Sequence, residues 1–401
     1  MKKKCIFLFF ILVSFFIIQG MNYQCDAATT VTSGNYQYEE QTDGTIKLIR
    51  YTDRTATQVA IPTAVDGKTV TALGSYLFYP TETQKPAVVK ATVPKTVTTI
   101  DPLAFVGCPA LEQIIVDSAN TKFTAVNGIL FSKDKTQLLH YPEGKSGTSY
   151  TIPTTTKIIG EDSFMDNQFL QTITIPSSVT QIQDWAFARA KLTSINIPTS
   201  VTKIGNGICS EMPELKTAVF SAKVSDLEYL SFTECSKLES INMSKSTVTG
   251  IDARAFFASD SLKSVVFPPN IKTISVYAFM GCNNLTSVVI PSTVTKIDAD
   301  AFAAGCKLDI SKTSLTKLSN GSYAEVVNIS VDATLDYEEA YKVLDLVNAE
   351  RAKVGASALK MDKKLLEAAM QRAAEISVYF EHTRPNGLRD SSHLSGVSYT
   401  K

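Results

Sequence analysis

Apolar residues return along the middle of this chain with a period of about 23 residues. Two sets of positions recur with this period. The residues of the first set end the short stretches in which apolar and polar residues alternate, and the residues of the second set are mostly Phe. The first set is Ile152, Ile175, Ile197, Phe220, Met243, Phe267 and Ile290, and the second is Phe164, Phe187, Cys209, Phe232, Phe256, Phe279 and Phe302. Self-similarity at this spacing indicates a solenoid, whose units bury their apolar edges only against their neighbours. A long stacked surface of this kind favours binding over catalysis.

Each repeat unit combines a short alternating strand with a turn and a corner. The stretch from Leu192 to Ile197 alternates apolar and polar residues, as a half-buried strand does, and Pro198 ends it. The residues expected to face the core are Leu192, Ile195, Ile197, Val201 and Ile204. We expect residues 186–187 of the preceding stretch to form a short helical or 3₁₀ corner. Successive strands then align in one parallel sheet.

Two segments depart from the period. Residues 37–52 alternate around Asp43-Gly44, a dipeptide typical of hairpin turns. We expect this hairpin to cap the first coil, because an open solenoid end exposes apolar surface and unpaired strand edges. Two early coils follow, at residues 61–78 and 93–105. The 59 residues from Phe105 to Phe164 exceed one period and predict an inserted hairpin at about residues 112–150, with His140 at its rim.

One consensus recurs from coil to coil: Ile-Pro-x-x-Val-Thr-x-Ile, then Ala-Phe, then Leu. It resembles the leucine-rich repeats of the BspA-like type, found on bacterial cell-surface and secreted proteins, over about Tyr36 to Leu318. The resemblance implies an α/β repeat solenoid, a right-handed coil with parallel strands, which we place at residues 34–318. Cys209 replaces the Phe in one coil, and residues 220–221 and 243–244 lack the Pro, so we expect local loosening there.

Composition changes after residue 318. Residues 319–336 form a Ser/Thr-rich stretch that we interpret as a linker. Residues 336–339 have the pattern of a capping box that opens a helix, and Gly355 is typical of a helix end. Asp362 then opens a second amphipathic helix. The chain therefore carries a helical segment at residues 337–401 behind its repeats.

This helical segment resembles the opening half of a CAP domain, also called SCP-like, at residues 346–351 and 380–387. The resemblance implies that His382 is one ligand of a divalent metal, which the family holds with a second His and two Glu. Counterparts of those three residues do not follow His382 in this sequence. One His cannot form a site that needs three or four ligands. We therefore expect a structural or vestigial role for His382, and we expect no cofactor.

Residues 1–27 have the pattern of a secretory signal peptide. Three Lys at positions 2–4 precede an apolar run at residues 5–18, and Ala27 offers a small residue for cleavage. This pattern predicts a secreted or extracellular protein, either released or associated with the cell surface. No other stretch reaches the ~20 apolar residues needed to cross a bilayer, so we expect no membrane span after signal removal.

Charge and motifs exclude several classes of function. Lys plus Arg and Asp plus Glu both number 39, so the net charge of zero leaves no basic field for nucleic acid. The sequence lacks a Gly-rich phosphate loop, an HExxH motif and a nucleophile elbow. We therefore expect a protein with no catalytic residues.

Three cysteines share one slot of the repeat. Cys108, Cys235 and Cys282 each lie three residues after the repeat Phe, where a small buried side chain fits. A CxxC pair or a His cluster does not accompany them, so a metal site is not favoured. We expect buried free thiols. A disulfide stays open only between Cys282 and Cys306, which lie on adjacent coils.

The outward strand positions form the candidate partner-binding face. Its first row is Thr172, Ser194, Thr217, Ser240, Ser264 and Ser287, and its second row is Thr174, Asn196, Val219, Asn242, Val266 and Val289. These side chains either solubilise a regular sheet or form a flat, neutral docking face for a protein. Sugar binding is disfavoured, because both rows lack aromatic residues for stacking. Trp185, Leu230 and Tyr277 share another slot, which we expect to be exposed at an edge and to contact a partner.

Two functions follow from these patterns. The first is a secreted or surface-associated bacterial leucine-rich-repeat protein, a monomer that binds a protein of the host matrix or the bacterial surface and mediates adhesion without catalysis. The second is a CAP-family extracellular effector, metal-binding or hydrolytic, which its repeats target. Continuation of the native gene past Lys401 with the missing Glu and His residues would favour the second.

Overall fold

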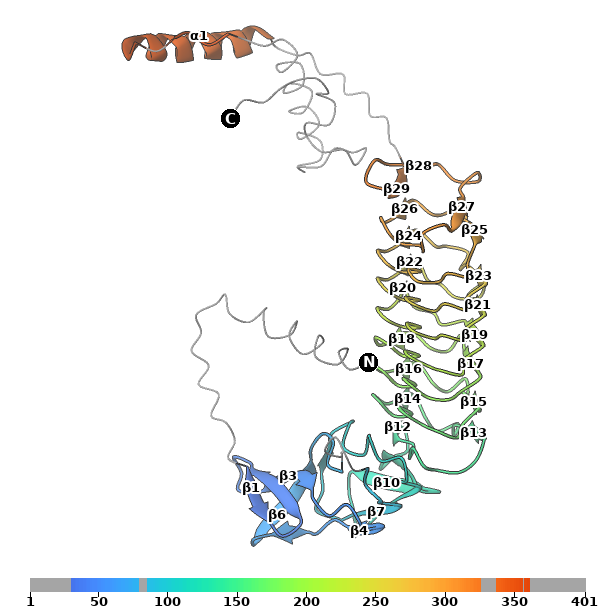
Figure 1. Cartoon of the computed structure of the whole chain (residues 1–401). Helices are drawn as coiled ribbons and strands as arrows, with labels where there is room; N and C mark the ends of the chain where they lie inside the picture. Colours follow the sequence, from blue (N-terminus) through green and yellow to red (C-terminus); the bar gives the residue numbers. More distant parts are fainter. Residues whose placement is uncertain (1–29, 79–84, 326–336, 356, 361–401) are drawn as a thin grey trace.

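The structure, a computed structural model, describes residues 30–78, 85–325, 337–355 and 357–360. From residue 137 to residue 309 the chain winds into stacked coils, and each coil adds one strand to each of two columns (Figure 1). Within each column, runs of two to four of these strands pair in parallel with their neighbours one coil away. The predicted solenoid with parallel strands is therefore confirmed.

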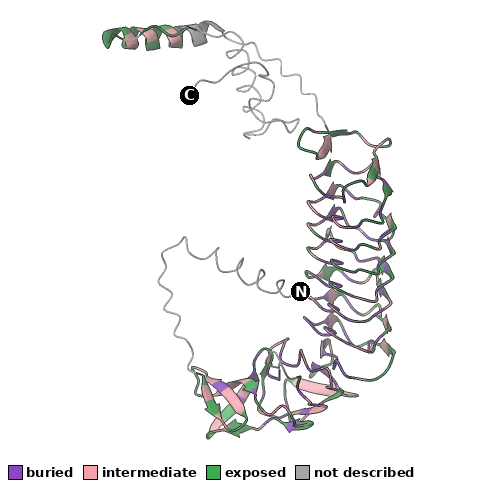
Figure 2. Cartoon of the chain, in the orientation of Figure 1, coloured by how far each residue is buried: buried purple, intermediate pink, exposed green. Residues whose placement is uncertain are grey.

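The first column holds the alternating strands that the sequence predicts. These strands are β13 (Ser149–Thr151), β15 (Thr172–Thr174), β17 (Ser194–Ile197), β19 (Thr217–Phe220), β21 (Ser240–Asn242), β23 (Ser264–Val266), β25 (Ser287–Val289) and β27 (Lys307–Asp309). In β17 the side chains of Ile195 and Ile197 are buried while Ser194 and Asn196 are exposed. Figure 2 shows this burial pattern repeating from coil to coil. Alternation along a pleated strand is the cause.

The second column consists of shorter strands, each with one Ile or Leu directed toward the core. They are β12 (Gln137–His140), β14 (Ile158–Ile159), β16 (Gln181–Ile182), β18 (Lys203–Ile204), β20 (Asp226–Leu227), β22 (Gly250–Ile251), β24 (Thr273–Ile274) and β26 (Lys296–Ile297). The apolar residues align in register, as Ile159 with Ile182 and Ile251 with Ile274. Both columns therefore close on one core between them.

The repeat Phe residues fill that core as a stack of rings. Phe232, Phe256 and Phe279 are fully buried, with ring centroids 5.5 and 4.9 Å apart along the stack. Offset stacks at this spacing add stabilisation beyond the burial of apolar area. Phe302 stacks on Phe279 at 4.9 Å but is half-buried, because it lies at the end of the row. The predicted spine is continuous, and buried Cys209 takes its place in the coil that lacks the ring.

The corners around these Phe residues are turns, so the expected helical or 3₁₀ corner is wrong. Trp185 and Arg189, two residues before and after Phe187, have φ angles of 54° and 56° in the left-handed region. Their N–H groups, with that of Phe187, donate to the next coil: Trp185 to Asn206, Phe187 to Ile208 and Arg189 to Ser210, each at 2.9 Å. A helix would keep these bonds within one coil. Bonding between coils offsets the ~1–2 kcal/mol that a left-handed L-residue costs.

One corner shows how a bulky side chain constrains the next coil. A Cβ on Gly207 would lie 2.3 Å from the ring of Trp185, and Gly207 itself has a φ of +58°. Glycine is therefore required at this position for two reasons: the ring of Trp185 approaches too closely for a Cβ, and the backbone φ is positive. Trp185 also packs against Val106, Met165 and Ala188.

The N-terminal end carries its own sheet. Its strands are β1 (Val31–Ser33), β2 (Tyr36–Glu40), β3 (Ile46–Tyr51), β5 (Ala64–Val65), β6 (Lys68–Leu73) and β8 (Thr99–Ile100), and a second small sheet holds β4 (Gln58–Ala60), β7 (Lys90–Val93) and β9 (Gln113–Val116). The predicted hairpin is β2 and β3, antiparallel to each other. Strand β1, which the sequence did not indicate, pairs with β2. The cap joins the solenoid because β3 pairs in parallel with β6.

A hairpin lies within the range predicted for the insertion, and the strands on either side of it, β9 and β12, pair with strands of the coils. Strands β10 (Phe123–Val126) and β11 (Ile129–Ser132) form a hairpin, and β12 pairs with β11 on one side and β14 on the other. Leu130 packs into the N-terminal core, whereas its neighbours Ile129 and Phe131 pack into the core of the coils. Strand β11 is thus the seam between two hydrophobic cores.

Two elements follow the last coil. Strand β29 (Tyr323–Glu325) pairs antiparallel with β26 and with β28 (Leu315–Lys317), so the fold continues past the expected boundary at residue 318. Helix α1 (Tyr337–Lys353) begins where the capping box predicts, and Gly355 follows its end with a φ of +72°. The segments expected for a signal peptide and for a second helix lie outside the described residues.

Candidate binding surfaces

The two predicted rows lie on the outer face of the first column, from β15 to β25. In-register pairing places Ser194 beside Thr217 and Asn196 beside Val219, and the same pairing continues through β21 and β23. Eleven of the twelve side chains are exposed, and Ser240 is half-buried. We call these twelve residues the outer face. Its existence follows from local alternation alone, because every second residue of each strand must point away from the core.

An apolar stripe follows one row of the outer face toward its C-terminal end. The exposed fractions of Val219, Val266 and Val289 are 40%, 47% and 56%. Asn242 lies between the first two of these in register. Nearer the insertion the same row holds the polar residues Thr174 and Asn196. The outer face is therefore polar at one end and partly apolar at the other.

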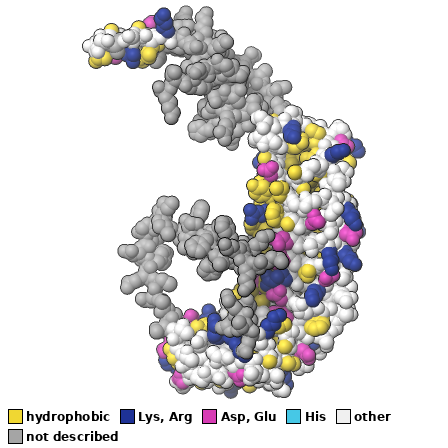
Figure 3. Space-filling model, viewed as in Figure 1, with side chains coloured by type: hydrophobic (Ala, Val, Ile, Leu, Met, Phe, Trp, Pro, Cys, Tyr) yellow, Lys and Arg dark blue, Asp and Glu magenta, His cyan; other side chains and the backbone are white. Residues whose placement is uncertain are grey.

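Charged side chains beside the outer face are paired between coils. Lys237 bonds Glu214 at 2.8 Å and Lys263 bonds Glu239 at 3.1 Å, all on residues that precede the strands. These exposed pairs contribute little to the free energy of unfolding. Because each pair joins a positive and a negative charge, this part of the surface has no excess of either sign. Figure 3 shows Lys, Arg, Asp and Glu interspersed over the visible face of the coils. This face of the described coils shows no basic patch of the kind that binds nucleic acid.

The edge slot of Trp185, Leu230 and Tyr277 is half-buried, not exposed as expected. The corner turns fold these side chains back over the neighbouring coil. Arg254, in the same slot, lies 5.6 Å over the ring of Phe257 and 5.7 Å over that of Tyr277. Cation–π contacts of this kind hold the edge internally. The outer face therefore offers more freely exposed side chains than this edge.

The cysteines that the structure describes are all free, so Cys282 and Cys306 do not form a disulfide. Cys108, Cys235 and Cys282 are buried, which confirms the expected small buried slot, and Cys209 is buried at the position of the repeat Phe. Burial raises the pKa of Cys235 and of Cys282 to about 12. Because the thiolate is the reactive form, these groups are chemically inert at neutral pH.

The structure brings no metal site together among the residues it describes. His382 lies outside those residues, so its role as an incomplete CAP ligand stays a prediction. His140 lies within them and is only 2% exposed, so its expected place at a rim is wrong. It is buried because the strand it closes, β12, belongs to the solenoid and turns this side chain inward against Phe105.

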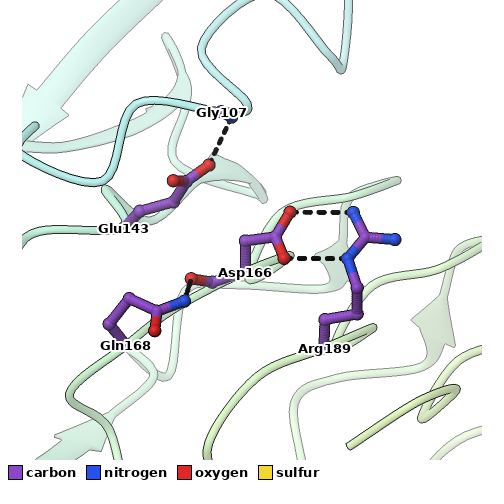
Figure 4. A network of polar contacts seen from close by, with 5 residues as sticks. All are labelled: Gly107, Glu143, Asp166, Gln168 and Arg189. Carbon is purple, nitrogen blue, oxygen red and sulfur yellow. Dashed lines mark hydrogen bonds and ion pairs between the residues drawn. The ribbon is translucent and has the colours of Figure 1, made fainter. Parts of the chain in front are cut away.

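A polar network that the sequence did not reveal joins the insertion to the coils (Figure 4). Glu143 is 2% exposed and accepts a hydrogen bond from the N–H of Gly107. Nearby, Arg189 donates to both carboxylate oxygens of Asp166, at 2.8 and 2.7 Å. Burial raises the pKa of Glu143 to about 8, and the charge of Asp166 adds to this, although the bond from Gly107 opposes it. Burial therefore favours the protonated form of Glu143, because it opposes the charged carboxylate more strongly than the backbone hydrogen bonds and the charge of Arg189 support it.

Within the described residues, α1 is too short and too polar to span a bilayer, and no other helix is a candidate. Asn348 of α1 exchanges two hydrogen bonds with the backbone of Leu359, at 2.9 and 2.7 Å. Leu346 and Val354 remain 69% and 79% exposed in the described part of the chain. The two hydrogen bonds tether residues 357–360 to α1.

Comparison with protein families matches residues 56–142, 140–263 and 249–337 to the BspA type leucine-rich repeat region. The chain belongs to the BspA-type leucine-rich repeat family. The match covers the coils and β28 and β29 at their C-terminal end, and it begins after the N-terminal hairpin of β2 and β3. The comparisons do not support the CAP resemblance of residues 337–401, which stays a prediction.

Among solved structures, this BspA-type chain is similar to a leucine-rich repeat protein from Eubacterium ventriosum, at 29% identity and a TM-score of 0.59, over 74% of this chain and 100% of that one. A leucine-rich cell surface protein from Faecalibacterium prausnitzii is 24% identical over 70% of this chain and 87% of its own, with a TM-score of 0.41. The pneumococcal vaccine antigen PcpA is 17% identical over 70% and 98%, with a TM-score of 0.34. Proteins of curated function gave no match.

Proposed function

We propose that this chain is a secreted or surface-associated bacterial protein that binds a protein partner through the outer face and mediates adhesion without catalysis. The observation that carries the proposal is the register: the eight predicted positions from β17 to β23 align in two rows, and eleven of all twelve positions are exposed. Stacked coils hold these rows on a rigid backbone, so binding requires little ordering of the surface.

The chemistry of the outer face favours a protein as partner. Hydroxyl and amide side chains adapt to backbone groups, and the exposed Val219, Val266 and Val289 supply apolar contact. The rows contain no aromatic ring on which a sugar could stack. They contain no Lys or Arg to hold phosphates. An uncharged, mixed surface of this type is common in non-obligate protein interfaces.

The size of the outer face sets a limit on the contact. Six strands at ~4.8 Å spacing span ~24 Å, and a strand face two residues wide adds ~10 Å. This area is below the ~800 Å² per partner of a standard interface. The partner therefore also covers the paired Lys and Glu side chains that precede the strands. The export that this function requires rests on the predicted signal peptide.

The test uses the full chain on wells coated with a mixed extracellular-matrix extract. Ser240→Arg combined with Asn242→Arg places two bulky charges at the centre of the outer face. We expect binding to fall about tenfold, since a loss of ~1.4 kcal/mol at an interface centre has this effect. The matched control is Ser177→Arg with Thr199→Arg, at exposed turn residues outside the rows.

Two further results decide the proposal. Thermal unfolding of both double variants should equal that of the parent chain, because all four side chains lie outside the core. Prior proteolysis of the coating should abolish binding, whereas enzymatic removal of its glycans should leave it intact. Unchanged binding by the Ser240/Asn242 variant, or binding that follows the glycans, would contradict a protein-docking role for the outer face.

A further inference from the structure

A cavity of about 260 Å³ lies where the insertion separates the two cores. Its walls come from β8 and the turn after it, from β11 and β12, and from the residues that follow β14 and β16. Strand β8 does not pair with β12, because the hairpin of β10 and β11 lies between them in the chain. The cavity is therefore a product of the interrupted period and is distinct from the outer face.

His140 lines the cavity and has unused hydrogen-bonding capacity. Its side chain is 2% exposed, with its ring centroid 5.7 Å from that of Phe105. Neither imidazole nitrogen has a hydrogen-bond partner among the described residues. Buried donors and acceptors are rarely left unpaired in folded proteins. A buried, unpaired imidazole at a cavity wall points to a ligand that hydrogen-bonds it.

The remaining walls combine an acidic rim with apolar surface. Asp101 and Glu161 supply carboxylates, whereas Phe105 and Leu139 supply apolar contact, and no Lys or Arg lines the cavity. Burial raises the pKa of Glu161, and the charges of Asp184 and Asp101 raise it further. Negative charge is therefore concentrated here without a cation from the lining residues, and this arrangement disfavours an anionic ligand.

The rim is held in place by two amides. Gln137 donates from Nε2 to Oε1 of Gln183 at 3.0 Å, and the same oxygen accepts from the N–H of Glu161 at 3.2 Å. Asp101 accepts from the N–H of Leu103 at 3.0 Å through one carboxylate oxygen. Both carboxylates are thus carried on backbone that side chains or turns hold in place, which keeps the rim preorganised.

We propose that this cavity binds the ammonium or guanidinium end of a ligand, on a short aliphatic stem, between the carboxylates of Asp101 and Glu161 and the imidazole of His140. The volume is below the ~300–1,000 Å³ of pockets for drug-sized ligands, so the ligand group is small. The apolar wall takes the stem. Burial lowers the pKa of His140 to about 4, so the ring is neutral at pH 7 and accepts a hydrogen bond from the cation without repelling it.

This proposal does not rest on the docking role of the outer face. The same chemistry can come from a free organic amine or from a Lys or Arg side chain of a protein. Three probes separate the possibilities: n-butylammonium, n-butylguanidinium and Nα-acetyl-lysine methylamide. The uncharged control is n-butanol, which has the same stem and can form hydrogen bonds.

The experiment uses the full chain with isotope-labelled histidine, because the sequence has only three His to assign. Binding is read from the ring resonances of His140 and by calorimetry at pH 7. We expect saturable shifts of His140 with n-butylammonium and n-butylguanidinium, and at least tenfold weaker binding of n-butanol. If Nα-acetyl-lysine methylamide also binds, the ligand group can belong to a protein side chain. If it does not bind while n-butylammonium does, the ligand is a free amine.

Variants test the carboxylates while preserving the fold. Glu161→Gln and Asp101→Asn keep the size of each side chain and should each weaken n-butylammonium at least fivefold. Glu112→Gln, at an exposed carboxyl outside the cavity, is the matched control and should change nothing. The proposal is overturned if His140 fails to respond to either cation, if n-butanol binds equally well, or if both carboxyl variants bind like the parent.

Discussion

The regular coils, residues 168–308, and the junction, residues 106–167, bury different kinds of polar side chain. In the regular coils these are hydroxyls: Ser210, Ser221, Ser231, Thr233, Ser246 and Ser259. The junction buries side chains with amide or ionisable groups as well: Asn120, His140, Glu143, Asp162 and Asn167. A hydroxyl can bond a nearby backbone carbonyl, as Ser246 does with Met243 at 3.0 Å. The larger groups need partners from distant segments.

Asn120 and Asn167 show what those partners are. Asn120 donates to the carbonyl groups of Pro94 and Val97 at 2.9 Å, and Asn167 donates to that of Pro142 at 3.2 Å. These bonds replace the ladder that coils of equal length form between themselves. A regular period thus satisfies its backbone by repetition, whereas a break in the period requires specific polar side chains. The junction is also where the cavity forms, beside the unpaired His140.

The largest expected effect tests the regular coils. Phe256→Ala removes a fully buried ring that stacks between Phe232 and Phe279. We expect the free energy of unfolding to fall by ~3–5 kcal/mol, the usual cost of a Phe-to-Ala cavity. Denaturant titration measures the change. The matched control is Phe169→Ala, at a ring that is 47% exposed, which should cost under ~1 kcal/mol. Equal losses in the two variants would show that the ring stack does not hold the coils.

The next effect belongs to the junction and depends on pH. The pKa of Glu143 is raised from its ordinary 4.5 to about 8, so the folded chain keeps a proton that the unfolded chain releases. The resulting stability is fully present below pH 4.5 and is lost as the pH rises to about 8. Glu143→Gln cannot ionise, and it should exceed the parent in stability at pH 7 by about 3 kcal/mol.

Stability measured from pH 4 to pH 8.5 tests this directly. The gap between Glu143→Gln and the parent should widen with pH, whereas Glu112→Gln, at an exposed carboxyl, should follow the parent throughout. Asp162, whose pKa burial raises to about 7, keeps some pH dependence in every variant. A constant gap would mean that Glu143 is ionised in the folded chain.

The smallest effect lies at the border of the two regions. Arg189→Lys replaces the two-bond contact with Asp166 by a single point charge. Because the two side chains are 41% and 27% exposed, we expect a loss of only ~0.5–1 kcal/mol. A double-mutant cycle with Asp166→Asn measures the coupling, which should shrink as salt is added. A coupling above ~2 kcal/mol would place this pair among the junction's buried contacts.

The sequence by itself determined the coils and the outer face. Each 23-residue unit places its strand in nearly the same surroundings, so local alternation decides which side chains, such as Ile195 and Ser194, face inward or outward. The same reasoning located the hairpin of β2 and β3 and the buried position of Cys108, Cys235 and Cys282. Here a residue's neighbours in space are its counterparts one period away, and the period can be counted along the chain.

Only the tertiary structure decided the corners, the junction and the C-terminal cap. The left-handed turns at Trp185 and Arg189 exist because their N–H groups bond the next coil, which no local pattern reports. The burial of His140 and Glu143, and the pairing of β29 with β26, depend on segments that packing brings together. Where the period stops, distance along the chain no longer predicts contact. The partners of each side chain are then set by how unequal coils pack against each other.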